Sequence, residues 1–410
     1  MNLGEIVFNK LQELGKITSS EEGVTRFFLT KEHKKANKLL KTWMEDAGLK
    51  VKVDNVGNIV GEYRSAFENA PTLVMGSHQD TVKNGGKYDG ALGIVLPIVV
   101  FKDFIKKVKT LPYNFKIIGF GDEEGGRFGT IYLGSKAVVG TFDYELLNEI
   151  DDDGVRLKEA LENFGVEGNK IEESKIKEKV DGYLEVHIEQ GPVLEDANIP
   201  VGIVKGIVGC HIYNFTFEGM AGHAGTVPMD LRKDAGVGVC STVVEIEKYV
   251  STVDDLVATI GKIDFSPYSI NVIPGKATFT LDIRSSNDEI IIDSIQKIKK
   301  IAQNIATRRG LKLDIQNINK ASSCNCDESI TKILEKSILS VKNIDINPFY
   351  LYSGAGHDAQ ELKKITNIGM LFVRCKEGIS HNPKESITPE DIEVASNVLT
   401  EFLKLYPNNN

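Results

Sequence analysis

The pattern of apolar and polar residues predicts two kinds of structure along the chain. In the first half, strands alternate with helices. Apolar residues between Leu39 and Ala47 recur at helical spacing, and Thr30 and Gly48 are residue types that begin and end helices. Strands separated by helices favour an α/β fold with a mixed, largely parallel sheet flanked by helices. The strands that we expect here are 49–53, 72–76, 113–121, 183–188 and 368–373, with a helix over about 91–108.

The block 209–321 has a different pattern. Its segments follow the order β-α-β-β-α-β, which is the split arrangement of a ferredoxin-like α+β domain. The block therefore predicts an inserted domain at 209–321 that divides a first domain into 1–208 and 322–410. The expected helices are 229–250 and 288–310, and the expected strands are 212–217, 256–263, 277–284 and 311–318.

Composition and charge exclude several classes of protein. Of 410 residues, 41% are hydrophobic and 26% charged, and the net charge is −9, so a nucleic-acid partner is not expected. The longest apolar run, 91–101, is too short to cross a membrane and contains Pro97. Five cysteines, an odd number without C-x-x-C spacing, and an N-terminus without a secretion signal predict a cytoplasmic protein.

Candidate metal ligands follow the predicted strands. His78 follows 72–76, His187 lies near the end of 183–188, and His381 comes shortly after 368–373. Ligands of parallel α/β folds lie outside the carboxyl ends of strands, so three histidines in such places are expected to converge. Carboxylates lie in the same kind of place: Asp89 follows His78 by eleven residues, and the acidic run 122–124 follows 113–121.

Three imidazoles and at least two carboxylates, with no thiolate, suit zinc, manganese, nickel or cobalt. Five ligands exceed one four-coordinate site and fit two metal ions that share a carboxylate. Each position also has a plainer interpretation. A lone histidine at a strand end often caps or packs, an acidic run often forms a solvated turn, and the glycine-rich stretch 76–90 is also typical of a loop.

The chain resembles a known family in a series of motifs that occur in order along the sequence. It is similar to the hydantoinase/carbamoylase family of dinuclear metal amidohydrolases, within the superfamily of aminoacylase and glutamate-carboxypeptidase type metallopeptidases. The resemblance spans roughly residues 70–385 and implies a catalytic domain, an inserted lid domain, and a homodimer formed through the lids. The motifs are GSHQDTVKNGGKYDGALGI (76–94), DEEGGRFGTIYLGS (122–135), EVHIEQGPVLE (185–195), GHAGTVPM (222–229), NVIPG (271–275), LDIR (281–284), SGAGHDAQ (353–360) and GISHNP (378–383).

The resemblance also implies a set of metal and catalytic residues. His78 and His187 would hold one metal ion, and Glu124 and His381 the other, with Asp89 bridging both. Further roles would belong to Asp80, which would orient the His78 imidazole, and to Glu123, which would act as the general base.

Substrate contacts are implied in the same way. Asn271 and Arg284 would grip a substrate carboxylate, because a guanidinium can form two parallel hydrogen bonds with it. His223 would reach the partner subunit's active site and stabilise the developing oxyanion. The remaining expectations are Gln190 beside the substrate, Gly354 and Ala355 as backbone contacts, His357 as a structural loop residue, and His33 as a solvated residue.

One departure from the family bears on the substrate. Allantoate amidohydrolases usually have Gly-Gln-Arg before the lid, and this chain has Gly209, Cys210 and His211. We therefore expect hydrolysis of the ureido C–N bond of an N-carbamoyl-L-amino acid, with His211 as a candidate replacement contact. Allantoate amidohydrolase or β-ureidopropionase activity is the alternative. Two further hypotheses are a dipeptidase or aminoacylase on the same scaffold, and a ligand-binding protein without catalysis.

Overall fold

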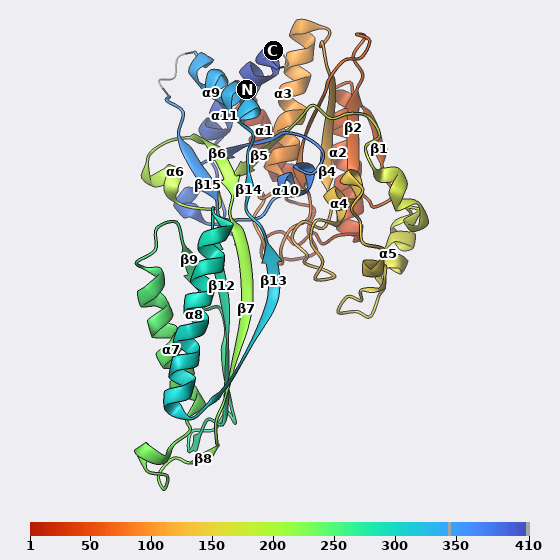
Figure 1. Ribbon diagram of the computed structural model, residues 1–410. Helices are drawn as coiled ribbons and strands as arrows, with labels where there is room; N and C mark the ends of the chain where they lie inside the picture. Colours follow the sequence, from red (N-terminus) through yellow and green to blue (C-terminus); the bar gives the residue numbers. More distant parts are fainter. Residues whose placement is uncertain (343–345, 407–410) are drawn as a thin grey trace. The chain divides into compact units, whose positions relative to one another are not determined.

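The computed structural model describes residues 1–342 and 346–406. Their chain divides into two compact units (Figure 1). The first unit comprises Met1–Lys205 and Cys326–Asn410, and the second comprises Gly206–Asn325. The bounds of the second unit lie a few residues outside the expected 209–321.

The first unit is built on a mixed sheet. β4, β3, β5 and β16 are parallel neighbours in that order, and antiparallel strands extend the sheet on both sides. All residues of β3, β5 and β16 are buried, so helices and loops cover both faces. β15 (Tyr350–Ser353) pairs with β6 (Val201–Ile207), and the last residues of β6 belong to the second unit, where they pair with β14 (Cys324–Asn325). The strand order is β1 (Lys50–Val53), β2 (Ile59–Tyr63), β4 (Asn114–Phe120), β3 (Thr72–His78), β5 (Gly182–Ile188), β16 (Ile368–Val373) and β6.

Two hydrophobic clusters hold the helices of this unit. The larger cluster joins the sheet to α1 (Leu3–Leu14), α2 (Lys31–Asp46), α3 (Leu92–Val108), α9 (Glu328–Ser340) and α11 (Pro389–Leu405). The smaller cluster contains α4 (Leu133–Val139) and α5 (Leu157–Phe164), with Phe28 and Phe128. The shorter elements are α6 (Val193–Asp196), α10 (Ala359–Leu362), and the 3₁₀ helices η1 (Tyr144–Asn148), η2 (Gly168–Ser174) and η4 (Lys376–Gly378).

The second unit has the predicted β-α-β-β-α-β order. Its antiparallel sheet runs β10-β12-β7-β13, β9 also pairs with β12, and α7 and α8 share a hydrophobic cluster with the strands. A short β8–β11 pair continues beyond the start of β12. The bounds are β7 (Gly209–Glu218), β8 (Gly222–His223), η3 (Met229–Leu231), α7 (Ala235–Val250), β9 (Val257–Thr259), β10 (Ile263–Ser266), β11 (Val272–Ile273), β12 (Lys276–Ser285), α8 (Asp288–Arg309) and β13 (Lys312–Ala321).

Two expected elements of this unit differ in their bounds. The helix expected over 229–250 begins only at Ala235, because the Asp234 side chain caps it by accepting a hydrogen bond from the Val237 N–H. The strand expected over 256–263 is two short strands, β9 and β10, which pair with different parts of β12. Local caps and pairing partners set these ends, and periodicity alone does not reveal them.

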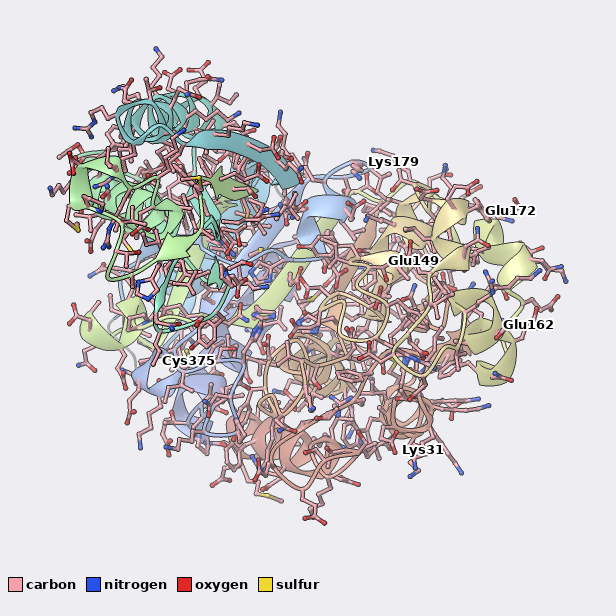
Figure 2. All side chains as sticks on the ribbon, turned by 90° about the horizontal axis from the view of Figure 1, so that it is seen from below. Lys31, Glu149, Glu162, Glu172, Lys179 and Cys375 are labelled. Atoms are coloured by element: carbon pink, nitrogen blue, oxygen red, sulfur yellow. The ribbon has the colours of Figure 1, made fainter. Side chains whose placement is uncertain are left out.

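The surface of the first unit is rich in charge. The labelled side chains of Lys31, Glu162, Glu172 and Lys179 are exposed at its periphery (Figure 2). Within the described residues, every helix falls short of the length and apolar character that a bilayer span requires.

The expectation that His33 is solvated is wrong. The residue is fully buried, and its ring packs against the rings of Phe28 and Phe164. His33 shares one face of α2 with Ala36, Asn37 and Leu40, and this spacing outweighs the polar neighbours in KEHKK. Its Nδ1 accepts a 2.9 Å hydrogen bond from the Leu29 N–H. Burial, helped by the charge of Arg26, lowers the pKa of His33 to about 3.

This burial predicts a loss of stability in mild acid. The folded pKa lies below the ordinary value of 6.5, so the unfolded chain takes up the proton first. The stability that neutral His33 provides is complete above pH 6.5 and falls as pH drops toward 3. At about 1.4 kcal/mol per pH unit, the protein should lose about 2 kcal/mol more than His33→Gln between pH 6.5 and 5. Urea unfolding at both pH values measures this difference, and parallel losses in the two proteins would contradict it.

Candidate metal centre and active site

The sheet topology brings the predicted ligands to one edge. His78 is the last residue of β3, and His187 is the last but one of β5. The acidic run 122–124 follows β4, and His381 lies in the loop after β16. These four strands are parallel neighbours, so their carboxyl ends meet at the same edge of the sheet. Asp89 joins them from the loop that precedes α3.

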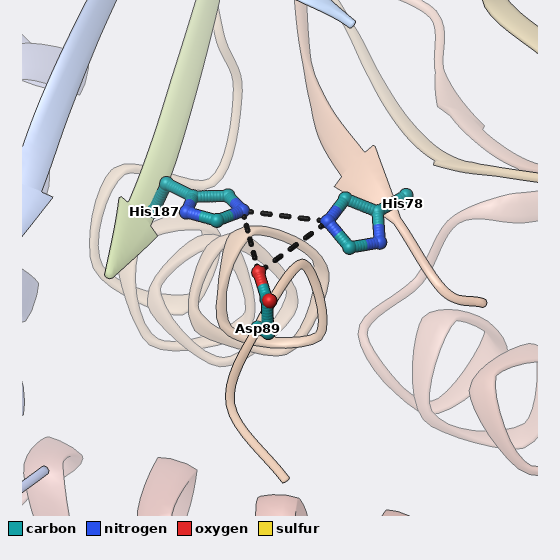
Figure 3. A group of neighbouring side chains, drawn as sticks. All are labelled: His78, Asp89 and His187. Carbon is teal, nitrogen blue, oxygen red and sulfur yellow. Dashed lines mark hydrogen bonds and ion pairs between the residues drawn. The ribbon is translucent and has the colours of Figure 1, made fainter. Parts of the chain in front are cut away.

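Asp89 lies between two groups of side chains. Its Oδ1 is 3.2 Å from Nε2 of His187 and 3.6 Å from Nε2 of His78 (Figure 3). Its Oδ2 is 3.3 Å from Nε2 of His381, which in turn lies 3.4 Å from Oε1 of Glu124. Within each group, the nearest donor atoms all lie within 4.8 Å of one another. One carboxylate therefore serves both groups, each through a different oxygen.

The donor atoms fit a pair of divalent cations. Asp89 Oδ1 and Glu124 Oε1 are buried, and neither accepts a hydrogen bond of good geometry from any described residue. A buried carboxylate oxygen without a partner is costly, and a cation would remove that cost. Imidazole nitrogen and carboxylate oxygen are also the ligands that zinc and its neighbours accept.

The electrostatics of the cluster show how strongly its members interact. Burial opposes the charged form of Asp89, but the surrounding His187, His381 and His78 imidazoles outweigh it and hold the pKa of Asp89 well below its usual range. Contacts with Asp89 and Glu124 raise the pKa of His381 to about 10, although burial opposes this. Negative and positive groups thus lie close together: Asp89, His78 and His187 are buried, and His381 lies at the exposed margin of the cluster.

Main-chain carbonyls orient two of the imidazoles. Nδ1 of His78 lies 2.9 Å from the carbonyl oxygen of Asp80, and Nδ1 of His187 lies 2.9 Å from that of Ile188. A carbonyl can only accept, so each Nδ1 carries the proton and each Nε2 faces Asp89. Asp80 therefore contacts the His78 ring through the carbonyl oxygen of its main chain.

The Asp80 carboxylate has a different contact. Its Oδ1 and Oδ2 accept the main-chain N–H groups of Glu123 and Glu124, each at 3.2 Å. These bonds fix the loop that carries both glutamates. Glu123 Oε2 lies 4.0 Å from Nε2 of His78, at the margin of the ligand cluster. Burial, together with the nearby carboxylates of Glu124, Asp358 and Asp80, raises the pKa of Glu123 well above its usual range.

The backbone around the cluster is strained. Asp122, Gln190 and His381 have φ values of +62°, +58° and +54°, in the left-handed region that favours glycine. Such strain tends to collect at functional sites, where the surrounding structure maintains it. Gly90 also has a positive φ, and a Cβ there would come within 2.5 Å of the His78 ring, so no larger residue fits beside this ligand.

Two further buried groups lie at the site: Glu185, to which no role was assigned from the sequence, and His357, which was expected to be a structural loop residue. Glu185 accepts hydrogen bonds from Ser77 Oγ, Tyr183 OH and the Ala359 N–H, at 2.7, 3.0 and 3.1 Å. His357 is buried, and its ring packs edge-on against His187 with 4.6 Å between centroids. The alternation of β5 gives a signal for Glu185, because its side chain points to the same face as that of His187, two residues on.

A cavity of about 530 Å³ adjoins the cluster in the first unit. His381 forms part of its wall, and so does Gln190, whose Nε2 donates to Asp89 Oδ2 at 3.1 Å. Gln190 Oε1 is buried and accepts no hydrogen bond from the described residues. The other lining residues are Glu189, Gly191, Val193, Leu351, Tyr352, Gly354, Ala355, Gly378 and Ser380.

The remaining predicted site residues belong to the second unit and form two groups. His223 ends β8, and Asn271 directly precedes β11. The Ala224 N–H donates to the Asn271 carbonyl oxygen at 3.0 Å, and both His223 and Asn271 are exposed. Arg284 lies near the other end of β12. Its Nε and Nη2 donate to the Asp282 carboxylate at 2.9 and 2.8 Å, and this fork fixes the guanidinium.

His211 does not share a face with Arg284. In the antiparallel pair of β7 and β12, Arg284 lies opposite Cys210, and His211 lies opposite Ile283. Directly opposed residues point to the same face of a sheet, and successive residues point to opposite faces. The imidazole of His211 is therefore buried on the face that carries Tyr213 and Phe215.

Comparison with known proteins agrees with this geometry. The model of peptidase family M20/M25/M40 matches residues 74–405. An N-carbamoyl-L-amino-acid amidohydrolase of Pseudomonas sp. (strain NS671) is 38% identical over 404 residues, covering 97% of this chain and 96% of that protein. Allantoate deiminase 1 of Glycine max is 38% identical over 426 residues, covering 96% and 88%.

Solved structures give the same result. The crystal structure of an amidase of the hydantoinase/carbamoylase family from Burkholderia multivorans matches with a TM-score of 0.89 and 30% identity, covering 98% of this chain and 97% of that one. The family match, the relatives and the clustered histidines and carboxylates all agree. The chain therefore belongs to the M20/M25/M40 peptidase family and, within it, to the hydantoinase/carbamoylase family of metal-dependent amidohydrolases.

Proposed function

We propose that the protein hydrolyses the ureido C–N bond of an N-carbamoyl-L-amino acid to the L-amino acid, ammonia and carbon dioxide. The observation that carries the proposal is the Asp89 carboxylate, which faces a different ligand group with each oxygen, beside the largely buried Glu123. Relatives named as carbamoyl-amino-acid amidohydrolases support the reaction class, and those named as allantoate deiminases support the main alternative.

Two divalent ions fit the proposal. His78, His187 and Asp89 would hold one ion, and Asp89, Glu124 and His381 the other. When bound, the pair supplies a Lewis acid for the ureido carbonyl and lowers the pKa of water to about 7. We favour Zn²⁺, with Mn²⁺, Ni²⁺ or Co²⁺ as substitutes that the same ligands accept.

Glu123 is the proposed proton carrier. As the water oxygen bonds to the ureido carbon, Glu123 takes the water proton and passes it to the nitrogen whose C–N bond breaks. Its burial among other carboxylates raises its pKa, and this favours uptake of the proton. Asp80 supports the role, because its hydrogen bonds to the main chain of Glu123 and Glu124 hold these adjacent glutamates in place.

The cavity favours an amino-acid side chain. Gln190 Oε1 is an unused acceptor suited to a ureido N–H, and Gly354 and Ala355 leave room for a substrate main chain. Val193, Leu351 and Tyr352 offer apolar surface to a hydrocarbon group. Allantoate has a second ureido group instead, which such surface would leave poorly solvated. The Gly-Cys-His segment also lacks the arginine usual in allantoate amidohydrolases.

The lid residues support a homodimer with shared sites. His223 and Asn271 lie beyond the first residue of β12, Lys276, and Arg284 is its penultimate residue. At about 3.3 Å per residue, roughly 26 Å of strand separates them. One small substrate cannot touch both groups of one lid. We propose that Arg284 binds the substrate carboxylate in its own subunit, and that His223 and Asn271 complete the site of a partner subunit.

The odd number of cysteines supports a cytoplasmic location, as part of the same proposal.

Ammonia release tests the reaction and the base. N-carbamoyl-L-methionine should give ammonia faster than allantoate or ureidopropionate at equal concentration. Glu123→Gln should keep its metal and lose roughly 10²–10⁴ in kcat, because the amide cannot accept the proton. A coupled ammonia assay with metal analysis measures both. Faster turnover of allantoate would favour allantoate amidohydrolase activity. Cleavage of dipeptides alone would favour the hypothesis of a dipeptidase.

Metal removal tests the ligand assignment. Chelation should abolish turnover and lower the free energy of unfolding, and Zn²⁺ at 100 times its Kd should restore about 2.7 kcal/mol for each ion bound. Asp89→Ala should lose this response, because Asp89 contributes to both groups. His223→Ala, in the second unit, is the control and should keep it. Urea unfolding with and without Zn²⁺ measures the response, and an unchanged midpoint in the native protein would refute the assignment.

Subunit mixing tests the shared site. His223→Ala and Glu123→Gln should each be nearly inactive alone. Equal mixing after dissociation and reassociation should restore up to about a quarter of native activity, because half of the dimers then carry one intact site. Activity that stays at the level of the separate variants, in dimers shown to have exchanged subunits, would mean that each subunit acts alone.

A further inference from the structure

Glu385 makes an unusual set of contacts beside the metal ligands. It lies four residues after His381 in the loop before α11, and only 5% of it is exposed. Its Oε1 accepts the main-chain N–H groups of Tyr88 and Asp89, at 2.9 and 3.1 Å. These bonds join parts of the chain that are almost 300 residues apart. A buried carboxylate thus binds the backbone of the residue that links the two ligand groups.

The other oxygen of Glu385 reaches the side chain of Asp89 indirectly. Ser380 Oγ lies 3.0 Å from Glu385 Oε2 and 3.2 Å from Asp89 Oδ2. Ser380 directly precedes His381, so the same contacts also tie down the loop that carries this ligand. Glu385 therefore holds Asp89 by its main chain and, through Ser380, by the oxygen that faces His381.

The loop before Asp89 needs an external support. It contains Gly85 and Gly86, and Gly90 follows Asp89 directly. Glycines give the backbone wide conformational freedom, so this loop has little stiffness of its own. Gly86 also leaves the space that Glu385 occupies, because a Cβ there would lie 2.0 Å from Glu385 Oε1. The Glu385 carboxylate therefore fills the space that a side chain at position 86 would take.

We propose that Glu385 is a positioning residue, which fixes the Asp89 loop so that the two carboxylate oxygens of Asp89 face the two groups of metal ligands. This inference rests on the proposed dinuclear site. A bridging carboxylate must present each oxygen within a few tenths of an ångström of its place, and hydrogen bonds behind the ligand provide that accuracy. Glu385 acts through Asp89 and touches no ligand atom itself.

The test compares three variants in their affinity for Zn²⁺ alone. Glu385→Gln keeps an amide oxygen for both main-chain N–H groups, and its NH₂ can donate to Ser380, so its affinity should stay near that of the native protein. Glu385→Ala loses all of these bonds and should bind at least one of two Zn²⁺ ions roughly 10–100-fold more weakly. Gly86→Ala should weaken binding similarly, because its Cβ displaces the carboxylate without removing it.

Asp327→Ala is the matched control. Asp327 Oδ2 also accepts a main-chain N–H, that of Ile368, at 2.7 Å, and pairs with Lys363. Ile368 begins β16, so this contact lies at the end of the strand remote from His381. The control should lose stability without loss of Zn²⁺ affinity. This comparison separates general destabilisation from positioning.

Calorimetric titration of the metal-free proteins gives the affinities, and elemental analysis gives the metal content. Native affinity in Glu385→Ala, or in a folded Gly86→Ala, would overturn the inference. Equal weakening in Glu385→Gln and Glu385→Ala would also overturn it, because the charge and not the hydrogen bonds would then matter. If the native protein itself binds no Zn²⁺, the proposed dinuclear site fails first, and that result is distinct from the others.

Discussion

The site depends on one carboxylate with two different neighbours. Asp89 Oδ1 faces His78 and His187, and Oδ2 faces His381, which also meets Glu124. Burying Asp89, His78 and His187 beside a second carboxylate costs free energy through desolvation and repulsion between carboxylates. The imidazoles around Asp89 offset part of this free-energy cost. A pair of cations would satisfy the buried carboxylate oxygens that accept no hydrogen bond from described residues.

Around that carboxylate, main-chain groups provide most of the order. Carbonyl oxygens of Asp80 and Ile188 set the two buried imidazoles, and the Asp80 carboxylate holds the glutamate loop by its N–H groups. Glu385 does the same for the Asp89 loop. Positive φ values at Gln190 and His381 show that the surrounding contacts impose a backbone these residues rarely adopt. Rigid strands and buried carboxylates together give flexible loops a fixed geometry.

The second unit divides its polar residues between the two ends of one strand. His223 and Asn271 lie beyond the start of β12, and Arg284 lies near its end, held by Asp282. The alternation of β7 further separates Cys210, on the face of Arg284, from His211, which is buried on the other. The proposed shared site rests on the separation of the two ends, and the alternation leaves His211 without a place beside Arg284.

Periodicity alone was enough for the fold class, the β-α-β-β-α-β order and the strand ends that carry His78 and His187, because hydrophobic spacing reflects local backbone geometry. It did not reveal the burial of His33, the main-chain role of Asp80 or the contacts of Glu385. A polar side chain gives no sign in the sequence of which distant N–H group it will meet. Those pairings arise only when β3, β5 and β16 are aligned, and when loops almost 300 residues apart close over the same carboxylate.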